Sequence, residues 1–111
     1  MSRTPRRRGE ARRTVAIARI ADHALSSADA ILARWLPDGK RQGAEWVARN
    51  PTRGDARPGS FKVNAKSGLW ADFSTGERGK DLVSLAAYLS RQNQVEAALA
   101  VAEMLGINAY E

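Results

Sequence analysis

The sequence predicts an α+β fold in which a small three-stranded antiparallel sheet is flanked by N-terminal and C-terminal helices. Three observations predict it. Apolar residues recur at helical spacing over 14–36 and again over 81–106. Between these segments, 45–73 contains short runs in which apolar and polar residues alternate, as is typical of strands. Glycine and proline gather between the runs, where turns are expected.

The chain has 111 residues, of which 43% are hydrophobic, and this suffices for one domain with a modest core. We divide it into a flexible basic arm over 1–13 and a single domain over 14–111. The arm holds six arginines against one acid, Glu10, and Pro5 and Gly9 interrupt any helix there. An arm that contacts phosphates and an unstructured terminus without a role explain this composition equally well.

The first helical segment covers 14–36, either as two helices or as one bent helix. Ser26 followed by Asp29 fits a capping box, which predicts that a second helix opens there. Pro37 and then Gly39 end it, because proline lacks the backbone N–H and glycine favours the terminating conformation.

Three strands are expected over 45–49, 60–64 and 69–73, separated by loops that contain glycine and proline. Successive side chains of a strand point to opposite faces. We therefore predict one face toward the helices and one toward solvent. The predicted inward residues are Phe61, Val63, Leu69, Ala71 and Phe73.

The C-terminal helices have clear start and stop signals. Asp81 is expected to cap a helix that runs to about residue 90, and Asn93 with Glu96 forms a capping box for the last one. Gly106 suits a glycine-terminated end. The loop before Asp81 either holds an anion at the helix N-terminus or is a plain loop before a capped helix.

Charge favours a polyanionic partner. Lys and Arg number 18 against 12 Asp and Glu, a formal net charge of +6. A solvated basic surface without a partner is the alternative. The chain has no cysteine and one histidine, His23, which excludes disulfides and a Cys/His zinc site. We expect no metal and no other cofactor.

The sequence contains no recognisable catalytic constellation. No carboxylate pair comes with a base or nucleophile partner, and a phosphate-cradling GxxxxGK[ST] motif is missing. We therefore expect that the chain is not an enzyme by itself. No apolar run approaches the roughly 20 residues that span a bilayer, and no secretory signal is present, so we expect a cytoplasmic protein without a membrane partner.

The predicted outward face of the sheet carries the candidate binding residues. Trp70 and Lys62 would point outward together, and an exposed ring can stack an unpaired base for about 1–3 kcal/mol. The alternative is that Trp70 packs under a helix. Trp46 and Trp35 are expected in the core. Basic residues on strand ends and loops flank this face: Arg49, Arg53, Arg57, Lys66, Arg78 and Lys80.

The run from Gly43 to Leu85 resembles the zinc-ribbon domain that begins bacterial and phage DNA primases. That family has an aromatic before Cys-Pro-x-His, then Pro-Ser-Phe and a hairpin, an aromatic before Cys-x-x-Cys-Gly, and Gly-Asp before a helix. This chain carries, in the same order, Trp46, Asn50-Pro51, Arg53, Pro58-Gly59-Ser60-Phe61, Trp70, Asp72, Thr75-Gly76 and Gly79-Lys80-Asp81.

All four ligand positions of that domain are replaced, by Asn50, Arg53, Asp72 and Thr75, so the chain resembles a degenerate zinc ribbon without metal. Zinc supplies most of the folding free energy of such small domains. We expect contacts of the flanking helices to replace it. An Arg53–Asp72 ion pair, or hydrogen bonds from Asn50 and Thr75, would bridge the former metal position. The chain is most similar to metal-free forms in primase-helicases of phages and mobile elements.

The resemblance implies a role in replication priming, as a module that contacts single-stranded DNA template. The implied partners are single-stranded DNA and a primase polymerase or helicase domain, or another replication protein. In the family the polymerising carboxylates lie in a following domain, so the chain is either part of a longer primase or a free-standing accessory. Two alternatives stay open: a protein-interaction adaptor or inhibitor on the ribbon scaffold, and a helix-turn-helix regulator that uses the first two helices.

Overall fold

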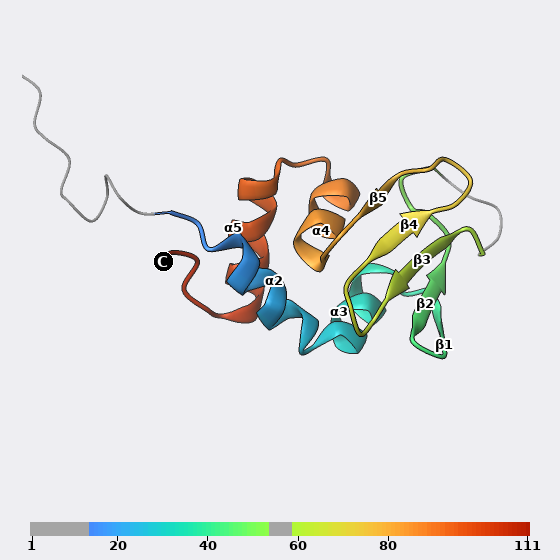
Figure 1. The fold of residues 1–111 in the computed structure, drawn as a ribbon, viewed down its shortest axis with the longest axis horizontal. Coiled ribbons are helices and arrows are strands. Elements are labelled where there is room, and N and C mark those ends of the chain that lie inside the picture. The colour runs from blue at the N-terminus through green and yellow to red at the C-terminus, as the bar shows by residue number, and fades with distance from the viewer. Residues whose placement is uncertain (1–13, 54–58) are drawn as a thin grey trace, which may run out of the picture.

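The computed structural model describes residues 14–53 and 59–111, and these form an α+β fold as predicted. Two helices, α2 (Ile17–Leu25) and α3 (Ala28–Trp35), precede the sheet, and α4 (Leu82–Ser90) and α5 (Gln94–Leu105) follow it (Figure 1). The predicted arm over 1–13 lies outside the described residues.

The sheet has five strands rather than three. They are β1 (Lys40–Gln42), β2 (Glu45–Ala48), β3 (Phe61–Asn64), β4 (Trp70–Asp72) and β5 (Arg78–Gly79), and each pairs antiparallel with the next one along the chain. The two edge strands were missed because β1 is entirely polar and exposed, and β5 has only two residues. β1 and β5 are strands because they pair with β2 and β4, whereas their own amino-acid composition does not favour a strand.

The predicted facing of β4 is wrong. Val63 pairs with Trp70 and Phe61 pairs with Asp72, which places all four side chains on the face toward the helices. Leu69 and Phe73, expected inside, are 56% and 69% exposed. A shift of one residue exchanges the two faces of a strand.

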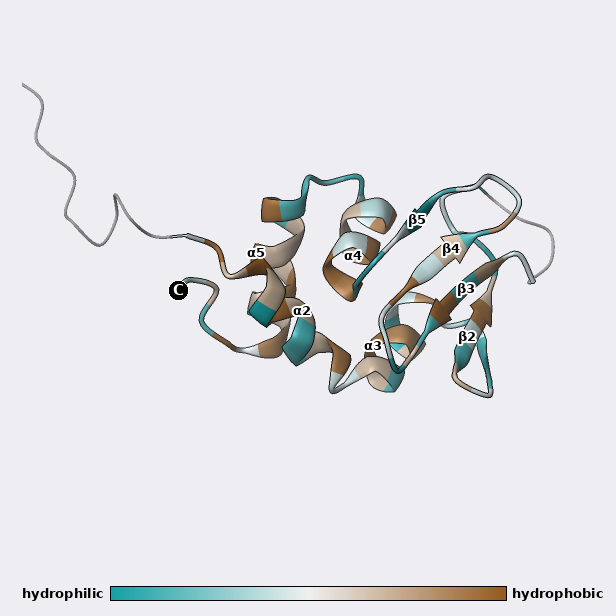
Figure 2. Cartoon of the chain, viewed as in Figure 1, coloured by the Kyte–Doolittle hydropathy of each residue, from teal (hydrophilic) through white to brown (hydrophobic). Residues whose placement is uncertain are grey.

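Figure 2 shows hydrophobic residues of β2, β3, α3 and α4 toward the middle of the molecule and hydrophilic residues in the connecting loops. The inner face of the sheet rests on α3 and α4, because Trp46 donates to the Leu36 carbonyl at 3.1 Å and Trp70 donates to Ser84 of α4 at 2.9 Å. On the other side of α4, α2 and α5 complete the helical layer. Phe61, Leu82 and Leu85 are fully buried in the resulting core.

The predicted ends of the C-terminal helices are confirmed. Asp81 caps α4 in a reciprocal capping box with Ser84, and Asn93 caps α5 in the same way with Glu96. Gly106 adopts the left-handed conformation (φ 71°) that ends α5. These helix ends could be predicted from the sequence because capping depends on residues close together in the chain.

The N-terminal segment forms two helices, and its predicted start signals are wrong. The N-cap of α3 is Ser27 without a side-chain cap, since the Ser26 hydroxyl donates instead to the His23 carbonyl at 2.6 Å. Helix α2 begins at Ile17 rather than near residue 14, because Val15 forms a bridge with Tyr110 near the other chain end.

Candidate functional site

Three of the four positions that the sequence resemblance assigns to metal ligands meet in a polar cluster with a buried centre, which we define as Asn50, Arg53, Asp72, Ser74 and Tyr88. Asn50 and Asp72 are fully buried. The Asn50 amide donates to Asp72 Oδ2 at 2.7 Å, and Arg53 Nε donates to the same oxygen at 3.1 Å. The expected Arg53–Asp72 ion pair and Asn50 hydrogen bond are therefore confirmed.

The second oxygen of Asp72 is also satisfied. Asp72 Oδ1 accepts from the Ser74 backbone N–H at 2.9 Å and from the Ser74 hydroxyl at 2.7 Å, while Arg53 Nη2 donates to that hydroxyl. Asn50 also donates to the Tyr88 hydroxyl at 2.7 Å, and that hydroxyl donates to Glu77 at 2.7 Å. These bonds tie to α4 the two ribbon loops, by which we mean the loop that follows β2 and the loop between β4 and β5. A buried carboxylate is stable only when its lone pairs are occupied in this way.

The fourth position does not join the cluster through its side chain, contrary to expectation. The Thr75 hydroxyl donates to Glu77 at 3.2 Å, and only its backbone N–H reaches the Asp72 carbonyl, at 3.3 Å. Residues 14–53 and 59–111 contain no group of three His, Cys, Asp or Glu side chains that could hold a metal ion. The donor set at this position, an amide and a guanidinium around one carboxylate, does not fit zinc.

The environment of Asp72 favours its charged form. Burial works to raise the pKa of Asp72, but hydrogen bonds from Asn50 and from the side chain and backbone of Ser74, together with the Arg53 charge, outweigh it. The pKa of the carboxyl is thus held well below its usual range.

This low pKa predicts a loss of stability in acid. The unfolded chain binds the Asp72 proton near its ordinary pKa of 3.8 and the folded chain binds it only at lower pH, so the stabilisation is complete above that pH and declines below it. We expect the difference in free energy of unfolding between wild type and Asp72→Asn to narrow from about pH 5 to about pH 2. Urea titrations at several pH values measure it, and a constant difference would contradict the assignment.

Trp70 is a core residue, and the expectation that it is exposed is wrong. Only 5% of it is accessible, and its ring lies 4.8 Å from that of Tyr88 and 6.0 Å from that of Phe61, between centroids. A side chain at Gly79 would collide with the Trp70 indole, which explains the glycine there. Because both faces of the ring are covered by the fold, a nucleobase cannot stack on it.

The side of the sheet that faces away from α3 and α4 is the candidate nucleic-acid interface. The strand pairings place one row of side chains on this outer face, running across the sheet from β1 to β5: Lys40, Val47, Lys62, Ala71 and Arg78. Leu69 and Phe73 lie on the same face, since they alternate with Trp70 and Asp72. A hollow of about 350 Å³ lies on it, lined in part by Lys62, Phe73 and Arg78.

The structure separates the predicted binding residues. Lys62 and Arg78 are on the outer face, and Arg49 continues it but forms an ion pair with Asp38 at 3.5 Å. Exposed Lys66 lies in the turn between β3 and β4, and exposed Lys80 lies beyond β5 beside α2 and α4. Arg53 belongs to the polar cluster, and Arg57 lies outside the described residues.

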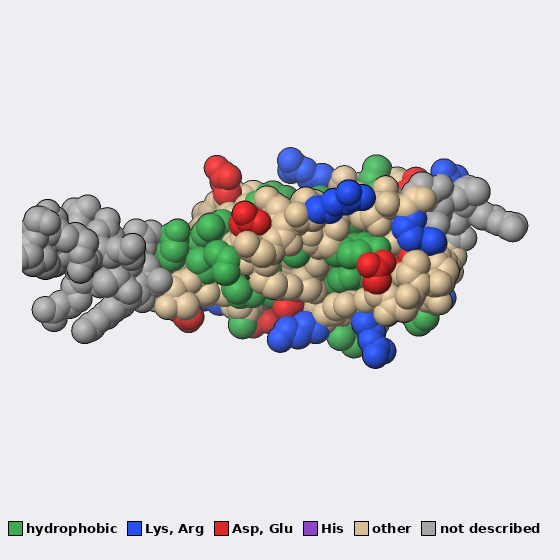
Figure 3. Space-filling model, turned by 90° about the horizontal axis from the view of Figure 1, so that it is seen from above, with side chains coloured by type: hydrophobic (Ala, Val, Ile, Leu, Met, Phe, Trp, Pro, Cys, Tyr) green, Lys and Arg blue, Asp and Glu red, His purple; other side chains and the backbone are tan. Residues whose placement is uncertain are grey.

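Sequence reasoning missed three residues of this face: Lys40, Leu69 and Phe73. The reversed facing of β4 hid Leu69 and Phe73, and the unpredicted strand β1 hid Lys40. The signal that points to Leu69 and Phe73 is the pair Trp70 and Asp72 between them, whose polar atoms both find partners inside. Figure 3 shows Lys and Arg side chains spread along the molecule, several of them over its sheet part, with hydrophobic side chains exposed both near the helical end and in the middle of the face.

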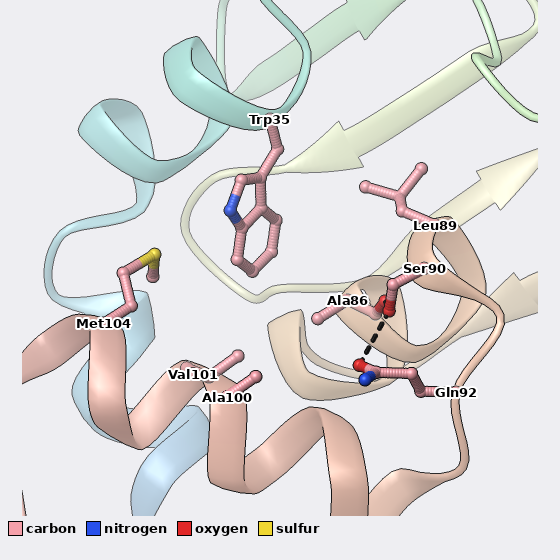
Figure 4. A pocket seen from close by; sticks show the side chains of 8 residues that line it. All are labelled: Trp35, Ala86, Leu89, Ser90, Gln92, Ala100, Val101 and Met104. Carbon is pink, nitrogen blue, oxygen red and sulfur yellow. Dashed lines mark hydrogen bonds between the residues drawn. The ribbon is translucent and has the colours of Figure 1, made fainter.

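A second hollow of about 300 Å³ lies among the helices. Trp35 of α3, Leu89 of α4 and Met104 of α5 line it together with smaller residues, and the Ser90 hydroxyl and Gln92 meet at its rim (Figure 4). Within the part of the chain that the structure describes, no helix is long and apolar enough to cross a membrane.

No protein-family model and no curated protein matches this sequence. The fold matches the crystal structure of the Aquifex aeolicus primase, described as its zinc-binding and RNA polymerase domains, with a TM-score of 0.68 and 20% sequence identity. The match covers 86% of this chain and 22% of the primase chain, in the region of its zinc-binding domain. The chain therefore has the fold of a primase zinc-binding domain and spans about a fifth of that chain's length, and its own sequence contains no cysteine.

Proposed function

We propose that this chain is a non-catalytic module that binds single-stranded DNA template during replication priming, as part of a DNA primase or primase-helicase or as an accessory to one. The observation that carries the proposal is the outer face of the sheet, where Lys40, Lys62 and Arg78 lie in one row on the side away from α3 and α4. The fold shared with the Aquifex aeolicus primase supports the link to priming.

The electrostatics of the outer face suit a phosphate backbone. The residues that line the hollow on the outer face include one acid, Glu45, and two cations, Lys62 and Arg78, so positive charge is in excess there. Each phosphate that a cation neutralises releases counterions, and the affinity then falls as salt rises.

We expect wild-type protein to bind a labelled single-stranded oligonucleotide with an affinity that falls steeply with salt. Replacing Lys62 and Arg78 together by alanine should reduce the slope of log K against log salt by about 1.4, since each single-strand phosphate contact contributes about 0.7. Fluorescence anisotropy at several salt concentrations measures the slope.

The matched control removes the same charge from the helical layer. Arg34→Ala combined with Arg91→Gly changes two exposed arginines and suits the left-handed backbone of residue 91. The slope should stay near the wild-type value. Equal slopes for the two double variants would contradict the outer face as the interface.

A second candidate function, binding of a partner protein, is favoured by the hollow among α3, α4 and α5. Its apolar lining of Trp35, Leu89 and Met104 would suit an apolar segment of a primase or replication protein. A helix-turn-helix function is supported less, because α3 offers one cation, Arg34, and also carries an acid, Asp29, which pairs with Arg41.

A further inference from the structure

Phe73 is held in an exposed position by the fold. Its ring belongs to a residue that is 69% exposed, and its backbone N–H donates to the Ser60 carbonyl at 2.8 Å, which extends the β3–β4 pairing by one step. The neighbouring Leu69 is 56% exposed on the same face. Burial of such side chains is favourable, so two of them at the ends of one short strand, both facing solvent, point to a ligand.

A cation lies beside this ring. The Lys62 ammonium is 5.8 Å from the centroid of Phe73, within the range of a cation–π interaction. Lys62 pairs with Ala71, two residues before Phe73, so the lysine and the ring are diagonal neighbours across β3 and β4. The ammonium lies over the ring, so the aromatic ring and the positive charge are presented together on the outer face.

A small side chain, Ala71, lies between the exposed side chains of Leu69 and Phe73 and forms the floor of the hollow. Ala71 separates Leu69 from Phe73 along β4, and Arg78 pairs with Ala71 from β5. The hollow over this floor, about 350 Å³, is near the lower end of the roughly 300–1,000 Å³ typical of small-ligand sites. It combines an aromatic surface, an aliphatic side chain and two cations.

We propose that Phe73 is the platform on which one unpaired nucleobase stacks, with Lys62 and Arg78 holding the adjoining phosphates; this rests on the proposed function. Two cations beside exposed apolar groups select a polyanion with flat apolar rings over an uncharged apolar peptide. Stacking requires a free base face, which a duplex does not offer along its length. The platform therefore confers preference for single strands, whereas the cations alone bind either form.

The test uses the full chain and a labelled oligothymidine of about 12 nucleotides, within the roughly 4–16 nucleotides that small single-strand-binding folds cover. Phe73→Ala should weaken binding roughly 5- to 150-fold, the range that loss of one stacked base produces. Phe73→Trp keeps a stacking ring and should bind within about threefold of wild type. Val95→Ala, which removes another exposed hydrophobic side chain, on α5, should have no effect.

An abasic oligonucleotide gives a readout that a structural role of Phe73 would not move. It should bind wild type as weakly as the thymidine strand binds Phe73→Ala, and that variant should not distinguish the two strands. Equal affinities of wild type and Phe73→Ala for the thymidine strand would overturn the platform and leave the proposed function standing if Lys62→Ala/Arg78→Ala still weakens binding. Absence of salt-sensitive binding by wild type would overturn the proposed function, and the platform with it.

Discussion

Replacement of Asp72 by alanine is expected to lower the free energy of unfolding by about 1–3 kcal/mol, the range for leaving a buried hydrogen-bond donor, here the Asn50 amide, without its acceptor. Asp72 is fully buried, and its removal leaves the Asn50 amide and the Arg53 guanidinium without the acceptor that satisfies them. Urea denaturation monitored by circular dichroism measures the change. Glu103→Ala, an exposed acid on α5, is the control and should stay within about 0.5 kcal/mol of wild type.

A double-mutant cycle with Arg53→Ala tests whether the two residues act as a pair. The loss of unfolding free energy in the double variant should be smaller than the sum of the two single losses, because removing both side chains leaves no charged group without its partner. Additive losses, or a melting curve of Asp72→Ala equal to that of wild type, would contradict the conclusion that the polar cluster joins the two ribbon loops.

The cluster does not replace the full energy of a metal. Structural zinc contributes about 10–16 kcal/mol in small zinc-binding peptides, several times the value expected for Asp72. The helices supply further stabilisation, since Phe61 and Trp70 of the inner face stack around Tyr88 of α4. The hydrophobic layer thus holds the sheet, and the polar cluster fixes the loops at its end.

Trp70→Ala is the second large effect that we expect, with a loss of about 3–5 kcal/mol. The substitution leaves a cavity beside the rings of Phe61 and Tyr88, both of which contact the indole, and leaves the Ser84 hydroxyl without its indole donor. Thermal and urea denaturation measure the loss.

The same variant separates a core role from a binding role. At a temperature where Trp70→Ala is still folded, its affinity for the oligonucleotide should match that of wild type. Phe73→Ala, an exposed aromatic three residues along the chain, should show the reverse pattern, with nearly unchanged stability and weaker binding. A stable Trp70→Ala that no longer binds DNA would instead identify Trp70 as the stacking residue.

Several features of this protein were predictable from the sequence because they depend on local chemistry. Asp81 with Ser84, and Asn93 with Glu96, satisfy helix ends through residues three positions apart. The order of elements followed from hydrophobic periodicity. The family motif placed Asn50, Arg53 and Asp72 together across about twenty residues, and their hydrogen bonds are present in the fold.

Tertiary structure decided which face of β4 is buried and where the sheet ends. Alternation fixes that Trp70 and Phe73 point to opposite sides but not which side is inside. That choice depends on α4, where Ser84 accepts the hydrogen bond of the Trp70 indole and Tyr88 packs against its ring. It also depends on Asn50, whose amide donates to the Asp72 carboxylate. The edge strands exist only through their neighbours' backbone hydrogen bonds. The sequence by itself determined the helical segments, the three central strands and the net positive charge. Packing between distant segments chose the surface that carries that charge beside an exposed aromatic ring.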